Sequence, residues 1–333
     1  MTPRLRVAVL GGGRSSEHDV SLRSAASVAG ALDPARYEVV PITIGRDGVW
    51  HDAAGAVVSV TPGGGGPLGA DVVFPALHGP FGEDGTVQGL LEMLDVAYVG
   101  SGVLGSSATM DKDVCKAILR GEGIDVARDV VVTPTSIRAA VAERVAAELG
   151  YPVFVKPARL GSSIGISRVP DAAALNAALD LALAHDSKVL VEELLAGEEL
   201  EVSVLGNDPA ALEASVVGRI GYAGEWYDYE AKYGEGGSWL DAPADLPADV
   251  AAAIRATALR AFAATDCRGM ARVDFFRSGG RVVLNEINTI PGFTATSYYA
   301  RMFEASGLAY PALLDRLVAL ALEHHDAQRA LRF

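Results

Sequence analysis

Short hydrophobic runs alternate with longer amphipathic stretches over the first hundred residues. The runs have the length and composition of buried strands, whereas the stretches between them repeat apolar positions at helical spacing. This alternation predicts a parallel α/β domain over residues 1–108. The strands are expected at residues 5–10, 37–44, 71–77 and 97–99, and the helices are expected to end near residues 32 and 94.

The alternation continues through the middle of the chain. One hydrophobic run ends in Lys156-Pro157, where proline prevents the strand from continuing. We expect a small central domain over residues 109–197 and a C-terminal domain over residues 198–333. The central elements are expected to be helices at 112–120, 136–149 and 171–184 and strands at 130–132, 151–157, 164–169 and 188–193.

The last third of the chain predicts a strand at residues 214–221 and helices at 248–264 and 311–325. Residues 194–204 are interpreted as an acidic connector. Residues 222–240 are rich in aromatic side chains and glycine without a strict period, which favours a long loop that closes over a site as a lid. A surface loop whose tyrosines pack on the body is the alternative.

Residues 269–288 predict two strands joined by a glycine-containing turn. Side chains alternate along a strand, so Arg272 and Asp274 share one face of the first strand. Glu286 and Asn288 share one face of the second strand by the same rule. The two faces coincide only if the loop has an odd number of residues, and we therefore predict a three-residue loop. Such a face would offer oxygen ligands to a hard cation, for which magnesium is the natural candidate.

Composition and charge narrow the class of protein. The chain has 333 residues, of which 50% are hydrophobic, and a formal net charge of -14 at pH 7. This acidity argues against a broad nucleic-acid surface. The apolar runs are shorter than a bilayer span and the N-terminus lacks the order of a signal peptide, so we expect a soluble, cytoplasmic protein without a membrane partner. The spacing of Cys115 and Cys267 predicts buried thiols without a disulfide or zinc site.

Two glycine-rich segments are candidate phosphate sites. Residues 11–21 follow a strand and begin a helix, so their N–H groups suit an anion. They are a weak dinucleotide fingerprint because Ser16 replaces the third glycine. Residues 158–166 combine small side chains and hydroxyls that can close over phosphates. Residues 161–165 also fit G-x-S-x-G, so a serine hydrolase with Ser163 as nucleophile is an alternative, although the expected elements disagree with its strand-turn-helix context.

Other polar residues have two interpretations. His78 is either a turn histidine with local hydrogen bonds or a site residue. The acidic residues of the connector form either a solvated turn or, through Glu199, a contact to ribose hydroxyls. His324 and His325 are most simply surface residues at the C-terminal end of a helix, where a positive charge is favourable.

Several segments are specific enough to indicate a family: GGRSSEHDVS at 12–21, LHGPFGEDG at 77–85, MDK at 110–112, YEAKY at 229–233 and NEINTIPGFT at 285–294. Their order resembles that of the ATP-grasp enzymes. Within these enzymes the chain is similar to the D-alanine–D-alanine ligase family, and the resemblance covers nearly the whole chain.

The resemblance implies a three-domain ATP-grasp fold with α/β and α+β parts, in which the antiparallel sheet of the C-terminal domain carries the metal-binding hairpin. It implies ligation of two D-alanine molecules through a D-alanyl phosphate, for peptidoglycan precursor synthesis. ATP and two Mg²⁺ ions are the implied cofactors, with Mn²⁺ as a substitute and K⁺ as an additional activator. The implied assembly is a homodimer formed through the first domain.

The resemblance also assigns roles to residues. Glu17 would pair with the ammonium of the first D-alanine. Arg272 and the N–H of Gly292 would face the oxyanion of the second half-reaction. The implied catalytic residues are Glu17, Ser162, Tyr233, Arg272, Gly292 and Ser297; those for ATP are Lys112, Lys156, Ser163, Glu192, Glu193, Leu195, Glu199 and Lys232; those for substrate are Glu17, His78 and Ser297; and the metal ligands are Asp274, Glu286 and Asn288.

One residue departs from the family pattern, and one question of specificity remains. Glu193 stands where some members have a lysine, which leaves its role open. Lys232 and Tyr233 resemble the dipeptide-forming type and not the relatives that make D-alanyl-D-lactate. A nucleotide-binding regulatory module without chemistry is a third alternative, which the set of metal ligands argues against.

Overall fold

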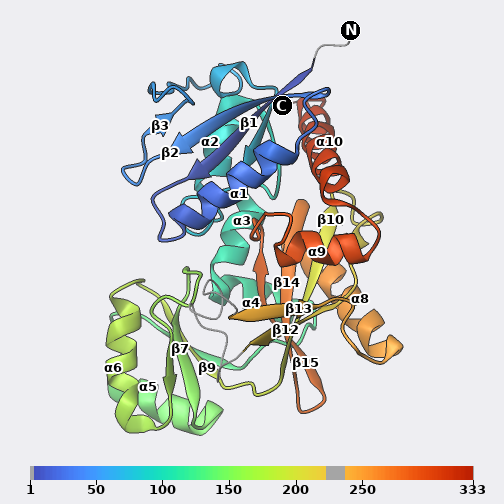
Figure 1. The fold of residues 1–333 in the computed structure, drawn as a ribbon. Helices are drawn as coiled ribbons and strands as arrows, with labels where there is room; N and C mark the ends of the chain where they lie inside the picture. The colour runs from blue at the N-terminus through green and yellow to red at the C-terminus, as the bar shows by residue number, and fades with distance from the viewer. Residues whose placement is uncertain (1–3, 223–236, 333) are drawn as a thin grey trace.

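The protein is described here by a computed structural model that covers residues 4–222 and 237–332. Three sheets follow one another along the chain, and helices pack on each of them (Figure 1). The first sheet lies at the top of the view, and the second and third lie side by side beneath it. Cavities between these three units are therefore bounded by segments far apart in the sequence.

The first sheet has the order β3-β2-β1-β4-β5, and its strands are parallel except for the edge strand β3. Its elements are β1 (Leu5–Gly12), α1 (His18–Ala31), β2 (Tyr37–Ile44), β3 (Trp50–His51), the short η1 (Pro67–Gly69), β4 (Val72–Pro75), α2 (Thr86–Leu94), β5 (Ala97–Tyr98) and the C-terminal α10 (Tyr310–Arg329). Because side chains alternate along β1, Val7 and Val9 pack with α1 and α10, whereas Ala8 and Leu10 pack with α2. The last helix thus shares the core of the first sheet.

The second sheet is small and antiparallel, with the order β6-β9-β7-β8. Its elements are β6 (Asp129–Val132), α5 (Arg138–Arg144) with the π-helical turn η2 (Val145–Leu149), β7 (Val153–Pro157), β8 (Ser167–Val169), α6 (Ala172–Leu183) and β9 (Val189–Glu193). Val141 of α5 and Leu175 of α6 are buried with the valines of the strands. The helices α3 (Val103–Met110) and α4 (Lys112–Gly121) precede this unit.

The third sheet has the order β13-β12-β10-β14-β15, with β11 beside β10. Its elements are β10 (Glu198–Gly206), β11 (Glu213–Ala214), β12 (Gly218–Tyr222), β13 (Ser238–Asp241), α8 (Ala248–Ala264), β14 (Gly269–Ser278), β15 (Arg281–Asn288) and α9 (Tyr298–Ala305). Leu200 and Val202 of β10 pack on Phe262 of α8 in one buried cluster. The opposite face of β10 and β14 is left for the polar side chains of the candidate site.

The hairpin of β14 and β15 has a two-residue loop, so the prediction of a three-residue loop is wrong. Ser278 pairs with Arg281, which leaves Gly279 and Gly280 as the loop. Both glycines have positive φ, 56° and 84°. Glycine adopts this conformation without steric cost, and two-residue hairpins favour it.

The extra residue that places Asp274 and Glu286 on one face lies inside β15 and not in the loop. The register shifts after Asp274 and leaves Asn285 as the extra residue of a β-bulge. Asp274 then lies opposite Glu286, and Arg272 lies opposite Asn288. Directly opposed residues share a face of the sheet, so the prediction of a common polar face is confirmed. The bulge in β15, and not a loop of odd length, produces it.

Other differences arise where local pattern and tertiary packing disagree. The expected connector at 194–204 contains the central strand β10, in which acids facing the site alternate with buried apolar residues. The expected strand at 214–221 is divided between β11 and β12, and the expected strand at 164–169 begins only at Ser167. Helix α9 had no counterpart among the predicted elements.

Among the described helices, no single one is both long and apolar enough to cross a membrane. Only α9 and α10 taken together reach that length and composition, and they meet at a bend of 105°.

Candidate active site

Two adjoining cavities lie among the three sheets. The first is bounded by the second sheet and the hairpin, and the second opens toward α1 and the turn after β4. The second cavity has a volume of about 400 Å³, which is within the usual range for small-molecule sites. Gly161, Ser162, Arg272 and Glu286 line both cavities. A group transferred between ligands in the two cavities would therefore pass these four residues.

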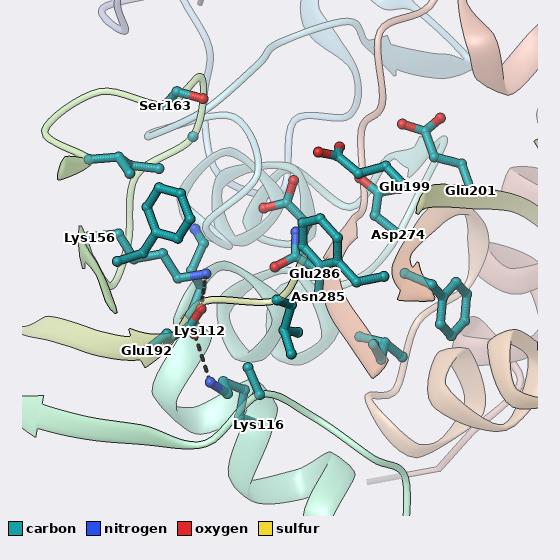
Figure 2. A pocket seen from close by; sticks show the side chains of 18 of the residues that line it. Lys112, Lys116, Lys156, Ser163, Glu192, Glu199, Glu201, Asp274, Asn285 and Glu286 are labelled. Atoms are coloured by element: carbon teal, nitrogen blue, oxygen red, sulfur yellow. Dashed lines mark hydrogen bonds and ion pairs between the residues drawn. The ribbon is translucent and has the colours of Figure 1, made fainter. Parts of the chain in front are cut away.

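The hairpin supplies the acidic side of the first cavity. Figure 2 shows Asp274 and Glu286 with the carboxylates of Glu199 and Glu201 from β10. Glu199 and Glu201 lie two residues apart on one strand, so they face the same side. Glu201 was not singled out from the sequence, although this spacing from Glu199 is the signal that could have found it.

Asp274 is held by neighbours on the hairpin. The Nε and Nη2 atoms of Arg272 donate to its carboxylate at 2.8 and 2.7 Å, and the amide of Asn288 donates at 3.0 Å. Glu201 pairs with Asp274 across β10 and β14, and its Oε2 atom lies 3.2 Å from Nε of Arg272. Arg272 is thus shared between two carboxylates on adjacent strands.

The oxygen donors of the hairpin fit a hard divalent cation. Asp274, Glu286 and Asn288 come together as two carboxylates and an amide on one face. Within residues 4–222 and 237–332, no group of three or more acidic, histidine or cysteine side chains could hold a metal ion on its own. A cation at Asp274 and Glu286 would complete its coordination with the amide oxygen of Asn288, water or a bound phosphate, and Mg²⁺ commonly takes oxygens from phosphates.

Lysines form the opposite side of the first cavity (Figure 2). Lys156, at the end of β7, pairs with Glu192 of β9 at 2.6 Å, and Lys116 of α4 pairs with the same carboxylate at 2.7 Å. Burial raises the pKa of Glu192, but the two lysines outweigh it and lower the pKa to about 2. Glu192 therefore stays charged and fixes both ammonium groups.

Lys116 is buried and was missed from the sequence. It lies one helical turn after Lys112 on α4, and this i, i+4 spacing is the signal that could have found it. It also pairs with Asp129 at 2.9 Å. Lys112 stands at the N-terminus of α4 and donates to the carbonyl of Leu160 at 2.8 Å, which brings it to the glycine-serine loop.

Glu193 points toward arginines at the rim. Its carboxylate lies 2.7 Å from Arg128 and 3.4 Å from Arg281, and it also accepts the N–H of Arg128. Burial raises the pKa of Glu193, but the hydrogen bonds and charge of Arg128 outweigh it and lower the pKa overall. Glu193, Leu195 and Glu199 all line the first cavity, as expected.

The glycine-serine loop touches both cavities. Ser162 and Ser163 have positive φ, 52° and 58°, a conformation that is uncommon for residues other than glycine. The hydroxyl of Ser162 donates to Glu17 at 2.5 Å. The loop runs from β7, which ends at Pro157, into another strand, β8, so the strand-turn-helix context of a hydrolase nucleophile is missing around Ser163.

The second cavity is lined by Glu17 and Ser297, which were expected at the substrate, and by Gly292, which was expected at the oxyanion. A Cβ atom added to Gly292 would stand 3.5 Å from the Ser297 hydroxyl, so the two residues are neighbours. Ser297 precedes α9 and accepts the N–H of Thr294 at 2.9 Å. The second cavity is also lined by Arg23 of α1, which the sequence did not single out.

His78 is buried with both ring nitrogens engaged. Nδ1 lies 2.9 Å from the carbonyl of Ile290, so Nδ1 carries the proton and donates. Nε2 accepts from the hydroxyl of Ser24 at 2.8 Å. Burial lowers the pKa of His78 and outweighs the opposite effect of Glu17, which favours this neutral form. His78 lines the second cavity, but its nitrogens hold protein groups.

Glu83, from the same turn, was not assigned a role from the sequence. It is partly buried in the wall of the second cavity and accepts N–H groups from Gly79 at 2.8 Å and from Ile290 at 3.0 Å. Burial and then the charge of Glu17 raise the pKa of Glu83 to about 8.

Lys232 and Tyr233 fall outside the described residues, so the expected lid contacts have no structural account. The described residues at the C-terminal end of that segment, Gly237 and Ser238, border the second cavity. Ser238 hydrogen-bonds Tyr298 of α9, with 2.7 Å between the two oxygens.

Comparison with known proteins identifies the family. The family described as D-ala D-ala ligase C-terminus matches residues 118–319, and that described as D-ala D-ala ligase N-terminus matches residues 6–64 and 61–101. D-alanine–D-alanine ligase A of Mesorhizobium japonicum is 48% identical over 98% of this chain and its own full length. D-alanine–D-alanine ligase of Deinococcus radiodurans is 47% identical over 96% of this chain and 98% of its own.

Solved structures give the same result. The D-alanine-D-alanine ligase of Coxiella burnetii is 35% identical, with a TM-score of 0.89 over 98% of this chain and 96% of its own. The VanG D-Ala:D-Ser ligase of Enterococcus faecalis is also 35% identical, with a TM-score of 0.87 over 96% of this chain and all of its own. The expected three-domain ATP-grasp fold is confirmed by these matches, and the chain belongs to the D-alanine–D-alanine ligase family.

Proposed function

We propose that this chain joins two D-alanine molecules into D-alanyl-D-alanine at the expense of ATP, as a step in peptidoglycan precursor synthesis. The observation that carries the proposal is the junction of the two cavities at Gly161, Ser162, Arg272 and Glu286. A nucleotide in the first cavity would there meet an amino acid in the second. The carboxylate of the first D-alanine takes the γ-phosphoryl group, ADP leaves, and the amine of the second D-alanine displaces phosphate from the resulting acyl phosphate.

The lysines position the nucleotide. Lys112 and Lys156 hold its phosphates, and Glu192 keeps Lys156 in place by pairing with it and with Lys116. In-line phosphoryl transfer depends on such positioning and on charge neutralisation more than on covalent help. Ser163 contributes a hydroxyl of the phosphate loop. Glu193 and Leu195 contribute mainly backbone at the adenine side, and Glu199 binds the ribose.

The hairpin holds the divalent cations. Asp274, Glu286 and Asn288 would bind two Mg²⁺ ions, with Mn²⁺ as a substitute, together with phosphate oxygens. When bound, these ions supply neutralisation of the charge that spreads over the transferred phosphoryl group. The support for this assignment is the register that sets Asp274 opposite Glu286. Activation by K⁺ is a further expectation from the family.

The second cavity binds the amino acids. Glu17, fixed by Ser162, pairs with the ammonium of the first D-alanine. Arg272 and the N–H of Gly292 stabilise the oxyanion that forms when the second amine attacks. Ser297, beside Gly292, receives the carboxylate of the second D-alanine. His78 acts through the protein groups that it holds.

The lid completes the site in this proposal. Lys232 reaches the γ-phosphate and Tyr233 bonds Ser162 when residues 222–240 close. Closure excludes water, which would otherwise hydrolyse the acyl phosphate. D-serine is a second substrate to test beside D-alanine, since the relative VanG is named as a D-Ala:D-Ser ligase.

The proposal extends to domains, assembly and location. The domains 1–108, 109–197 and 198–333 follow the three sheets, although α10 packs on the first sheet. The chain would act in the cytoplasm as a homodimer formed through the first domain. Its support is family resemblance, and sedimentation of the purified protein tests the dimer.

One assay tests the function. Phosphate release is measured with ATP, Mg²⁺ and D-alanine, and the product is identified by chromatography, with D-serine and D-lactate offered as second substrates. We expect release that requires all three components and yields the dipeptide. ATP binding without D-alanine-dependent release would favour a regulatory module. ATP-independent ester cleavage that a serine reagent abolishes would favour the hydrolase.

A further inference from the structure

One peptide of the segment that follows β15 is held on both sides by a single turn of the first sheet. The N–H of Ile290 donates to Glu83 at 3.0 Å, and the carbonyl of Ile290 accepts from Nδ1 of His78 at 2.9 Å. Glu83 also accepts the N–H of Gly79 at 2.8 Å, which ties its carboxyl to its own turn. The turn at 78–83 therefore binds both the N–H and the carbonyl group of Ile290.

The same segment is anchored again three residues later. Ser24 donates to Nε2 of His78, and its oxygen accepts the N–H of Phe293 at 3.3 Å. Phe293 is fully buried, and its ring centroid lies 5.4 Å from that of Phe74 in the first sheet. The backbone between Ile290 and Phe293, which includes Gly292, is thus held from the first sheet at each end.

We propose that Glu83 is a positioning residue that sets the N–H of Gly292 against Arg272 for the second half-reaction. The inference rests on the proposed function, because it assigns Gly292 to the oxyanion formed by attack of the second amine. The two oxygens of Glu83 accept the N–H groups of Gly79 and Ile290, so in the proposal Glu83 does not bind the oxyanion or the nucleotide directly. It acts through Ile290, and it links the first sheet to the hairpin that carries Arg272.

The chemistry of the group explains why a carboxyl is needed at this position. Two backbone donors, from Gly79 and Ile290, require two acceptor oxygens, and a carboxyl supplies both whether or not it is ionised. A glutamine has one acceptor oxygen and would turn an NH₂ group toward the other donor. Glu83→Gln therefore breaks one of the two hydrogen bonds to Gly79 and Ile290 but keeps the size of the side chain.

Asp84 provides a matched control in the next position. It accepts the N–H groups of Phe81 at 2.8 Å and Thr86 at 3.0 Å, so its bonds stay within its own turn. Asp84→Asn makes the same chemical change as Glu83→Gln without touching Ile290. It has no role in the proposed machinery.

The test measures the dipeptide formed per phosphate released, together with kcat and the KM for ATP. An oxyanion donor out of place slows capture of the acyl phosphate by the second amine, so water takes a larger share. We expect Glu83→Gln to lower kcat about tenfold, leave the KM for ATP unchanged, and reduce the ratio of dipeptide to phosphate below that of the wild type. Asp84→Asn should keep the wild-type ratio.

The possible outcomes distinguish a failure of the inference about Glu83 from a failure of the proposed function. A folded Glu83→Gln with a wild-type ratio overturns the inference, as does an equal fall of the ratio in Asp84→Asn. If Glu83→Gln does not fold, Glu83→Asp replaces it, because the side chain is one methylene too short to reach both donors and should lower the ratio in the same way. A wild-type protein that releases no phosphate with D-alanine would instead remove the proposed function, and the inference with it.

Discussion

The lysine side and the hairpin side of the first cavity both pair cations with carboxylates, but the pairings differ in kind. Lys156 and Lys116 share Glu192, and these three groups come from β7, α4 and β9. Arg272 and Asp274 lie two residues apart on one strand. Glu192, which the resemblance assigns to the ATP site, is paired with both lysines, whereas Asp274 is a proposed metal ligand.

The ion pairs on the lysine side form a fixed arrangement. On the hairpin side, Asp274 would exchange its pairing with Arg272 for a proposed metal ion. The lysine pairs are buried and can stay as they are when the nucleotide binds, so they preorganise the site. If Asp274 binds a cation as proposed, its oxygens pass to that cation, and Arg272 must then turn from it. Glu201, 3.2 Å from Arg272, provides a carboxylate that the arginine can keep.

The largest expected effect comes from Glu286→Gln, on the hairpin side. Glu286 lines both cavities and lies opposite Asp274, so the variant loses one of two anionic metal ligands. We expect turnover to fall on the order of 1,000-fold, with an unchanged melting temperature. Phosphate release measures the turnover, and thermal unfolding measures the melting temperature. Glu198→Gln, on the same sheet but paired with Arg277, is the control; wild-type rates in Glu286→Gln would remove the metal role.

Glu192→Gln tests the fixed arrangement. Lys156 and Lys116 lose their shared countercharge in a buried position, so the free energy of unfolding should fall by about 3 kcal/mol. The KM for ATP should rise, because Lys156 is no longer held. Urea unfolding and initial rates measure the two effects. An unchanged stability would mean that the three-residue pairing is not the rigid element described above.

The same variant has a predicted pH dependence. The pKa of Glu192 is lowered to about 2 from its ordinary value of 4.5. A lowered pKa in the folded state contributes stability that is present above about pH 4.5 and is lost as the pH falls toward 2. The difference in stability between wild type and Glu192→Gln should therefore be constant above pH 5 and shrink below it. A difference that grows on acidification would contradict the assigned cause.

Glu201→Gln tests the exchange itself. Without the Glu201 charge, Arg272 should hold Asp274 more tightly, and a divalent cation would compete less well. With ADP present in both samples, we expect Mn²⁺ to bind roughly tenfold more weakly to the variant, as followed by electron paramagnetic resonance without D-alanine. Equal affinity in wild type and variant would show that Arg272 does not depend on Glu201. Glu198→Gln again serves as the control.

The sequence predicted the part of the site that depends on local pattern. The strands of the first sheet follow from their hydrophobic runs, and the common face of Asp274 and Glu286 follows from the alternation of side chains along a strand. Both signals are properties of neighbouring residues. The loop length was wrong because a bulge at Asn285 and a two-residue glycine loop satisfy the same parity as a three-residue loop. Alternation alone cannot tell where an extra residue lies.

Residues whose importance comes from distant partners were missed. Lys116 matters because β9 brings Glu192 to it, and Glu83 because the hairpin ends beside its turn. Strand β10 was interpreted as a connector, since its acids obscured the alternation with Leu200 and Val202. These contacts join segments far apart in the sequence, and one sequence carries no signal of which segments will meet.

The smallest expected effect belongs to Glu193→Gln, at the rim of the lysine side. Glu193 pairs with Arg128 and Arg281, both of which are more than 40% exposed, so solvent weakens these pairs. We expect the KM for ATP to change by less than about twofold and the stability by about 0.5 kcal/mol. Initial rates at varied ATP and urea unfolding check both. A large rise in the KM for ATP would show that the Glu193 side chain contacts adenine directly. Glu193 would then belong, with Glu192 and its lysines, to the fixed charges that position the nucleotide.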